Sequence, residues 1–229
     1  MVTPGCRVCD VGCDHGYVSI YLVQQKISPC VIAMDVRRGP LSRCEEHVAR
    51  YGLEEYIESR LSDGLEKLKT GEVDAVVCAG MGGRLMQRIL TEGQDIAAGL
   101  KELILQPQSE LKAFREFLRI RGYRTVEENM IEEEGKFYPM MKVVPGERPI
   151  PLENSLYDRF GKLLLQNAHP VLYRYLQYRK EVLQAILDNI VKEGKNIESE
   201  VAGERDGIWE IKEELQDINR AFAFYEGRC

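Results

Sequence analysis

Three acidic residues of this sequence follow short runs of strand-forming residues, a pattern that could hold the sugar and base of a nucleotide-like ligand. Asp10 and Asp35 each close an apolar run, and Asp63 follows a third, more polar one. In an open sheet of parallel strands the carboxyl ends share one edge, where ligands bind. Each acid alone could instead cap the following helix, but three such strand ends favour a binding site.

A glycine-bearing turn follows the first run, in which Gly12 and Gly16 enclose Cys13, Asp14 and His15. Glycine permits backbone conformations and close approaches that a side chain blocks. The turn departs from the GxGxxG pattern that places a pyrophosphate on a helix N-terminus. Because Asp14 would repel a pyrophosphate, S-adenosyl-L-methionine fits better here than NAD.

On that interpretation each acid has a partner in the cofactor. Asp35 takes the ribose hydroxyls, and Asp63 with Gly64 lies at the adenine, whose amino group is a donor. Asp10 and Gly12 lie beside the methionine moiety. His15 is interpreted as a residue of the pocket or of the helix start. The chain has three histidines, far apart in sequence, so no metal site is expected.

A second glycine-rich turn follows the apolar run that ends at Ala79, and it contains Gly80, Met81, Gly82 and Gly83. Three glycines in four residues exceed what a tight strand-to-helix turn requires. We therefore predict that the backbone approaches the cofactor closely here. A plain tight turn is the alternative.

The elements that would position these residues alternate between strand and helix. Strands are predicted at residues 8–10, 30–34, 56–61, 73–79 and 103–105, each followed by a helical segment, of which the one after the third strand is short, at residues 65–68. A hairpin over residues 123–131 and 137–144, with a turn at Gly135 and Lys136, closes the series. The prediction is an α/β fold with a mostly parallel sheet, helices on both faces and one antiparallel strand.

A second domain is predicted after residue 150. The proline-rich segment 145–151 divides a domain at residues 1–150 from one at residues 151–229. Apolar residues in the second part recur at a spacing of three and four, which is typical of an antiparallel helical, coiled-coil hairpin. The clearest seam comprises Ile197, Val201, Glu204, Ile208, Ile211, Leu215, Ile218, Phe222 and Tyr225.

Composition limits the classes of protein to consider. The chain has 229 residues, 44% of them hydrophobic, and a net charge of −6, so an RNA partner would need a local basic patch. No leader and no membrane span is visible, which predicts a cytoplasmic location. Seven cysteines are an odd number, and we expect them to be reduced core residues, Cys6 and Cys9 included.

The ordered motifs resemble the bacterial TrmK family of tRNA (adenine(22)-N(1))-methyltransferases. The residues that carry the resemblance are DVGCDHGY, MDVRRGP, SDGL, VVCAGMGG, LILQPQSE and EEEGKFYPM. It implies a class I methyltransferase domain with a Rossmann-like sheet that binds S-adenosyl-L-methionine, and a helical hairpin that helps to hold tRNA. Members usually have a helical segment before the first strand, and this chain begins close to that strand.

By resemblance, the cofactor contacts are carried over to specific positions. They are Asp10, Gly12, Asp14, His15, Gly16, Asp35, Asp63, Gly64, Ala79, Gly80 and Met81. Adenine N1 carries a lone pair in its neutral form, so it can attack a methyl sulfonium without first losing a proton. A carboxylate near the developing positive charge would help, and Asp10 and Asp14 are the candidates.

Candidate RNA contacts are arginines near the strand ends and in the second domain: Arg37, Arg38, Arg84, Arg88 and Arg174. A helix after residue 107 adds Lys112, Arg115, Arg119 and Arg121, which a solvated helix face would also explain. Other hypotheses are a methyltransferase for a small molecule or protein, and a non-catalytic S-adenosylmethionine-binding interaction protein. The missing middle glycine and Asp14 disfavour an NAD-dependent oxidoreductase.

Overall fold

The computed structural model describes residues 1–192 and 202–226, and of residues 192 and 202–206 it describes the backbone alone. The chain divides into two compact units. Residues 1–129 and 138–153 form the first, and residues 130–137 and 154–229 form the second.

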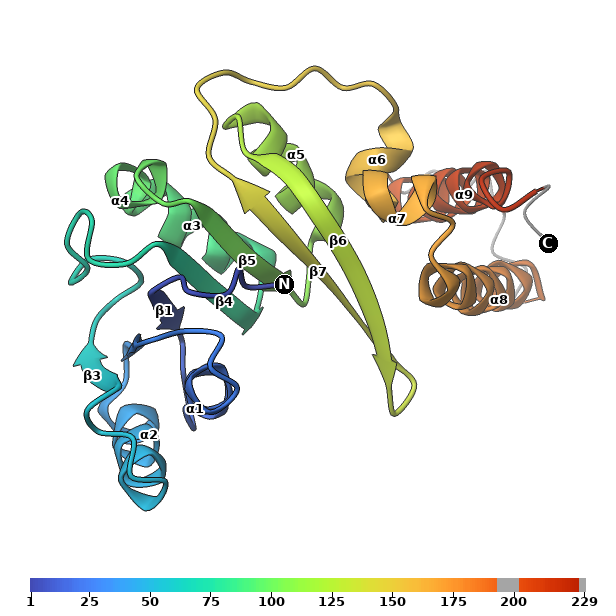
Figure 1. Ribbon diagram of the computed structural model, residues 1–229. Coiled ribbons are helices and arrows are strands. Elements are labelled where there is room, and N and C mark those ends of the chain that lie inside the picture. The colour runs from blue at the N-terminus through green and yellow to red at the C-terminus, as the bar shows by residue number, and fades with distance from the viewer. Residues whose placement is uncertain (193–201, 227–229) are drawn as a thin grey trace. The chain divides into compact units, whose positions relative to one another are not determined.

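One seven-stranded sheet organises the first unit, in the order β3-β2-β1-β4-β5-β7-β6 (Figure 1). Strands β1 to β5 are parallel and β7 runs antiparallel to β5, which confirms the predicted sheet. The strands are β1 (Val8–Val11), β2 (Val31–Asp35), β3 (Ile57–Leu61), β4 (Ala75–Met81), β5 (Glu102–Pro107), β6 (Arg124–Glu133) and β7 (Lys136–Val144).

Helices cover both faces of this sheet. They are α1 (Tyr17–Gln24), α2 (Arg38–Arg50), α3 (Gly83–Glu92), α4 (Gln94–Ala98) and α5 (Leu111–Ile120). Successive side chains of a strand point to opposite faces, so β1 feeds two separate cores. Cys9 and Val11 pack with residues of α3, α4 and α5, whereas Val8 packs with residues of α1 and α2. Strands buried on both faces explain the unbroken apolar runs of the sequence.

The hairpin between β6 and β7 has a two-residue turn, one position earlier than predicted. Glu134 and Gly135 both have positive φ, at 50° and 73°. Two central residues of this kind match the twist of the strands that they join. The proline-rich segment that follows β7 is hydrogen-bonded to the end of α5, because the Ile150 amide donates to the Arg119 carbonyl at 2.9 Å.

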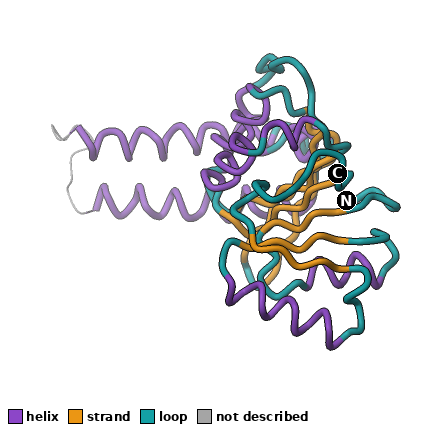
Figure 2. The backbone as a smooth tube through the Cα atoms, turned by 90° about the vertical axis from the view of Figure 1, so that its left-hand side faces the viewer, coloured by secondary structure: helices purple, strands orange, loops and turns teal. Residues whose placement is uncertain are grey.

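Helices α6 (Ser155–Phe160), α7 (Lys162–Gln166), α8 (Pro170–Lys192) and α9 (Ala202–Phe222) make up most of the second unit. Helices α8 and α9 lie side by side in both views (Figures 1 and 2). Leu172, Leu176 and Ile218 are among the buried residues of their shared core. Arg179, which interrupts the apolar spacing of α8, pairs with Glu214 of α9 at 2.7 Å.

The predicted coiled-coil seam remains a prediction over part of its length. Ile197 and Val201 lie outside the described residues, and the side chain of Glu204 is not described. Among the described residues no helix is both long and apolar enough to cross a membrane. The six described cysteines are free and all except Cys30 are buried, while Cys229 lies outside the described part.

Candidate functional site

The carboxyl ends of β1 to β4 border a cavity of about 310 Å³ in the first unit. Eight of the residues predicted for the cofactor line it: Gly12, Asp14, Asp35, Asp63, Gly64, Ala79, Gly80 and Met81. They come from four strand ends, which meet because parallel strands place their carboxyl ends on one edge.

Asp35 closes β2 and is only 7% exposed. Its Oδ1 accepts a hydrogen bond from the Arg37 backbone amide at 2.9 Å. Its Oδ2 has no hydrogen bond with any residue in the described ranges 1–192 and 202–226. A carboxylate with so little exposure to water gains from each hydrogen bond that it accepts, and a ligand hydroxyl at the cavity would supply one. Asp35 therefore fits a ribose diol.

Asp63 follows β3 and is held by Arg88 of α3. Arg88 Nη2 and Nη1 donate to the two carboxylate oxygens at 2.8 and 3.2 Å, and this charge-assisted pair lowers the pKa of Asp63. Arg88 also contacts Glu92 at 2.9 Å. The neighbouring Gly64 has a positive φ of 53° and lies against Ile89, where a Cβ would be 3.1 Å from two side-chain carbons.

Asp14 lies in the turn between β1 and α1, with a φ of 43° that few non-glycine residues adopt. Arg43 Nη2 donates to its Oδ1 at 2.8 Å and lowers the pKa of this carboxyl. Positive φ favours glycine at both Gly12 and Gly16, and at Gly16 the space is also limited by α2. A Cβ on Gly12 would overlap the methyl group of Met81, and one on Gly16 would lie 2.5 Å from Cys44 Sγ.

The second glycine turn is held against the loop that follows β5. The Gly80 amide donates to Gln106 Oε1 at 2.8 Å, and the Gln108 amide donates to the Met81 carbonyl at 2.8 Å. A Cβ on Gly83 would lie 2.6 Å from the Ser109 carbonyl oxygen. At Gly83 close approach therefore serves contact with this loop, which the sequence alone did not indicate.

Three predicted cofactor residues, Asp10, His15 and Gly16, do not line the cavity. Asp10 is buried within β1 and accepts a hydrogen bond from Ser19 Oγ at 2.7 Å. Burial raises the pKa of Asp10 to about 6. Gly16 packs against α2, and the His15 ring lies against Tyr17, with ring centroids 5.5 Å apart.

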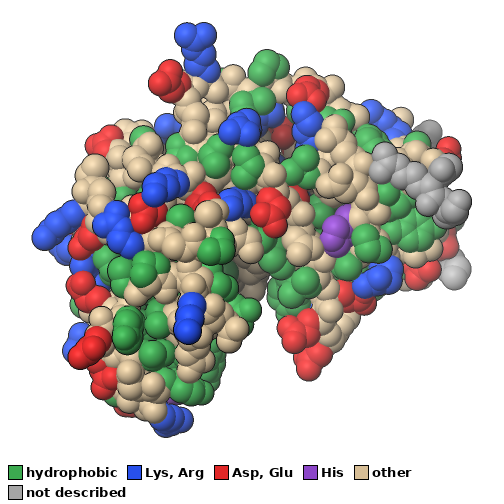
Figure 3. All heavy atoms as spheres, in the orientation of Figure 1, with side chains coloured by type: hydrophobic (Ala, Val, Ile, Leu, Met, Phe, Trp, Pro, Cys, Tyr) green, Lys and Arg blue, Asp and Glu red, His purple; other side chains and the backbone are tan. Residues whose placement is uncertain are grey.

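The candidate RNA contacts fall into two groups. Arg37 and Arg88 line the cavity, and Arg37 is exposed. The other three lie near carboxylates, since Arg84 pairs with Glu110, Arg38 approaches Glu45 and Arg174 pairs with Glu132. Basic and acidic side chains are interspersed on the face drawn in Figure 3.

The prediction that the basic residues of α5 lie on a solvated face is wrong for Arg115. Arg115 is buried, and its Nε lies 3.1 Å from Glu128 Oε1 on β6. Its charge is used inside the protein, so it is not a phosphate contact. Helical spacing alone did not distinguish it from its exposed neighbours, because an ion pair across elements leaves no local pattern.

Several lining residues were not predicted from the sequence. They are Val11, Val36, Ser62, Leu85 and Ile89. The signal available in the sequence was an apolar residue directly after a strand-closing acid, Val36 after Asp35, and the structure shows Val36 to be 56% exposed. An apolar side chain at that position suits the flat face of a base.

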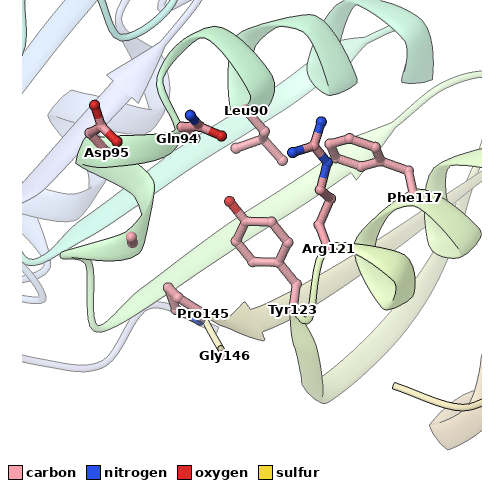
Figure 4. A pocket seen from close by; sticks show the side chains of 9 residues that line it. Leu90, Gln94, Asp95, Phe117, Arg121, Tyr123, Pro145 and Gly146 are labelled. Atoms are coloured by element: carbon pink, nitrogen blue, oxygen red, sulfur yellow. The ribbon is translucent and has the colours of Figure 1, made fainter. Parts of the chain in front are cut away.

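A second cavity of about 240 Å³ lies between the ends of α3 and α5 and the segment after β7 (Figure 4). Tyr123 points into it, and the Arg121 guanidinium carbon lies 5.7 Å from the centroid of the Phe117 ring. None of the predicted cofactor residues lines this cavity. Within the described residues, no group of three His, Cys, Asp or Glu side chains is arranged to hold a metal ion.

Comparison with known proteins identifies relatives that match most of this sequence. A family model described as tRNA (adenine(22)-N(1))-methyltransferase matches residues 8–213. The Bacillus subtilis tRNA (adenine(22)-N(1))-methyltransferase is 38% identical over 144 residues, which cover 63% of this chain and 60% of the relative. This chain thus matches about three fifths of that relative's length.

Two solved structures show the same architecture. The B. subtilis m1A22 tRNA methyltransferase TrmK has a TM-score of 0.82 at 28% identity and is matched over 96% of this chain and 93% of its own. A Streptococcus pneumoniae protein solved in complex with S-adenosyl-L-methionine has a TM-score of 0.82 at 32% identity, with 96% and 94% of the chains covered. The fold is that of class I methyltransferases.

Proposed function

Since this chain belongs to the tRNA (adenine(22)-N(1))-methyltransferase family, we propose that it transfers a methyl group from S-adenosyl-L-methionine to N1 of an adenine in tRNA. The observation that carries the proposal is the Asp35 carboxylate, buried at the cavity with one oxygen free for a ligand hydroxyl. As its substrate is tRNA, we expect the protein to act in the cytoplasm.

The cavity offers a different surface to each part of the cofactor. Asp35 would accept hydrogen bonds from the ribose hydroxyls, while Val36, Leu85 and Ile89 provide apolar contact for the base. The Asp63 carboxylate, already held by Arg88, would accept a hydrogen bond from the adenine amino group. Ionised carboxylates in the cavity favour a cationic ligand over a pyrophosphate.

The methionine end of the cofactor would lie along the turn after β1. Bare backbone at Gly12 leaves the space that the methyl group of Met81 partly fills. Bound S-adenosyl-L-methionine supplies an electrophilic methyl group on a positively charged sulfonium. Asp14, whose pKa Arg43 keeps low, stays ionised at neutral pH and would stabilise the positive charge as it develops on the adenine.

The nucleophile needs little help from the protein. The neutral adenine N1 lone pair forms the new N–C bond while the S–C bond breaks, and its electron pair remains on sulfur. The positive charge passes to the methylated base, so no proton has to leave first. The role left to the chain is to align the extruded base with the methyl group and to exclude water.

Between the two acids first considered, the observations favour Asp14 for charge stabilisation. Asp14 lines the cavity and its pKa is lowered. Asp10 does not line the cavity, and burial raises its pKa to about 6. We assign Asp10 the positioning of α1 through its hydrogen bond with Ser19.

For tRNA we propose Arg37 as a phosphate contact at the rim, since it is exposed and borders the cavity. We further propose residues 1–150 as the methyltransferase domain and residues 151–229 as a coiled-coil hairpin domain that holds tRNA. Among the described residues of the second part, none lines the cofactor cavity, which supports this division. Arg174 would have to exchange Glu132 for a phosphate, so its contribution should be small.

The experiment for this function is transfer of labelled methyl from S-adenosyl-L-methionine. Bulk bacterial tRNA, bulk protein and a small-molecule extract are offered in parallel, with Asp35→Ala as the matched control. Label in tRNA alone, lost with the control, supports the proposal. Label in protein or small molecules only would replace it with one of the other methyltransferase hypotheses.

A further inference from the structure

Three aromatic side chains from the start of α1 and from α2 lie together, beside the turn that joins β1 to α1. The ring centroid of His15 lies 5.5 Å from that of Tyr17 and 5.6 Å from that of His47, with interplanar angles of 15° and 21°. The centroids of Tyr17 and His47 lie 5.2 Å apart, with an interplanar angle of 23°. We call these three residues the ring cluster. Near-parallel rings at such separations stabilise one another and present their faces in a common direction.

The ring cluster continues into an exposed aromatic surface. Tyr17 is 62% exposed, and Tyr21, one helical turn further along α1, is 58% exposed. Tyr51, the residue directly after the end of α2, stands four residues after His47 and is 53% exposed. Residues four apart in a helix share one face, so Tyr17 and Tyr21 lie on the same side of α1. Exposure of this much aromatic surface calls for a partner.

The ring cluster is held in place by its backbone. His47 Nδ1 lies 2.9 Å from the His15 carbonyl oxygen, and in the tautomer with a proton on Nδ1 it donates a hydrogen bond. His15 directly follows Asp14, which lines the cofactor cavity. Three residues span at most about 11 Å, so Tyr17 lies close to the site of chemistry. Because the ring cluster is already held in place, its side chains lose little conformational entropy when a ligand binds.

We propose that the ring cluster stacks on an unpaired nucleobase of the RNA substrate, next to the adenine that enters the cavity. This inference rests on the proposed function. A base extruded for chemistry leaves neighbours unstacked, and exposed aromatic rings offer them a replacement face. Stacking of this kind tolerates any base, so it fixes the strand without reading its sequence.

Charge around the ring cluster is balanced once Asp14 is counted, whereas the whole chain has a net charge of −6. Helix α1 carries no charged residue. Helix α2 carries Arg38, Arg43 and Arg50 against Glu45 and Glu46. Arg50 forms no ion pair with any residue that the structure describes, which leaves it available for a phosphate at the edge of the surface.

The test compares two substitutions at Tyr17 in the full chain. Tyr17→Ala removes the most exposed ring of the cluster, and Tyr17→Phe keeps its face. Tyr56→Ala, at an exposed tyrosine just before β3 and remote from the carboxyl ends of the strands, is the matched control. Affinity for tRNA is measured by gel shift, affinity for S-adenosyl-L-methionine by calorimetry, and folding by thermal unfolding.

We expect Tyr17→Ala to weaken tRNA binding roughly 5- to 150-fold, the range that loss of one base–aromatic stack gives. Cofactor affinity should change less than about twofold, and Tyr17→Phe should stay within a few-fold of wild type. The factor lost should be similar at about 50 and about 200 mM salt, because stacking releases no counterions. The Tyr56→Ala protein should bind both ligands as wild type does.

Two results would overturn the inference while leaving the proposed function intact. In one, wild-type protein methylates tRNA and Tyr17→Ala binds tRNA as tightly as wild type. In the other, Tyr17→Ala changes the sedimentation of the protein alone, which would make the surface a contact between copies of the chain. If wild-type protein binds tRNA through Tyr17 but methylates none, the proposed function fails and the stacking surface stands.

Discussion

Gly83 and Ser109 lie so close together that a Cβ atom on Gly83 would come within 2.6 Å of the Ser109 carbonyl oxygen. The Gly83 amide also donates to Ser109 Oγ at 3.3 Å. The start of α3 is thereby held against the loop after β5. Both segments adjoin the strand ends that form the cavity, so this contact sets the position of the Gly80 turn.

Gly83→Ala should therefore destabilise the fold. Its methyl group meets a backbone carbonyl, which cannot swing aside as a side chain can, and overpacking of this kind costs about 1–3 kcal/mol. The measurement is the free energy of unfolding in urea. Gly39→Ala in α2, where a Cβ meets nothing within 4 Å, is the control and should be neutral or stabilising. Equal stability of Gly83→Ala and wild type would mean that the loop moves freely.

Asp35→Ala should weaken S-adenosyl-L-methionine binding by about 1.5–3 kcal/mol, the usual contribution of hydrogen bonds to a charged group. Asp35→Asn, which keeps the shape and one acceptor oxygen, should lose less. Calorimetry measures both, with thermal unfolding as a check that the buried site is intact. Unchanged affinity of Asp35→Ala would remove this carboxylate from the ligand site.

Asp14→Asn should lower kcat by at least about tenfold while binding the cofactor within a few-fold, because the lost charge acts on the transition state. Arg43→Ala is the matched variant, since it retains the carboxylate and removes its partner. At neutral pH its kcat should stay near that of wild type, because an unpaired Asp14 is still ionised there. Full kcat in Asp14→Asn would leave alignment alone as the source of catalysis.

Asp10 should make stability depend on pH in a direction opposite to that of most acids. Burial raises its pKa from 3.8 to about 6, so the folded protein binds the proton more tightly than the unfolded chain does. Stability from this group is therefore fully present below about pH 4 and is lost as the pH rises through 6, with a magnitude on the order of 2–3 kcal/mol.

The measurement compares wild type with Asp10→Asn in urea at pH 7 and pH 5. Between these values the wild type should gain stability relative to the variant. Paired acids such as Asp74, whose pKa Arg7 lowers, act in the opposite sense only nearer pH 4 and below, and they are common to both proteins. A difference independent of pH would show that Asp10 titrates normally in the folded protein.

The position of the cavity could be predicted from the sequence because the residues that form it follow local patterns. Asp35 ends β2 and Asp63 follows β3, and the pairing of parallel strands brings such ends together wherever the sheet forms. The order of apolar runs likewise predicted the parallel sheet and its one antiparallel strand. These features depend on periodicity and turn residues, which a single chain segment displays.

What sequence reasoning missed depends on contacts between distant segments. Asp10 shares a buried strand with Cys9 and Val11, and nothing in the sequence indicated that Ser19 would cover it. Arg115 matches its exposed neighbours in spacing, yet Glu128 holds it inside. The glycines of the second turn suggested a ligand, whereas Ser109 accounts for the crowding at Gly83. Each outcome needs the tertiary partner to be known.

The central claim, methyl transfer to N1 of a tRNA adenine, is tested most directly by mass spectrometry of digested nucleosides. Unmodified tRNA with an adenine at position 22 is incubated with the protein and S-adenosyl-L-methionine, beside the same tRNA with guanine there. We expect N1-methyladenosine in the first tRNA, none in the second, and none with Asp35→Ala protein. Methylated nucleosides other than N1-methyladenosine, or equal methylation of both tRNAs, would contradict it.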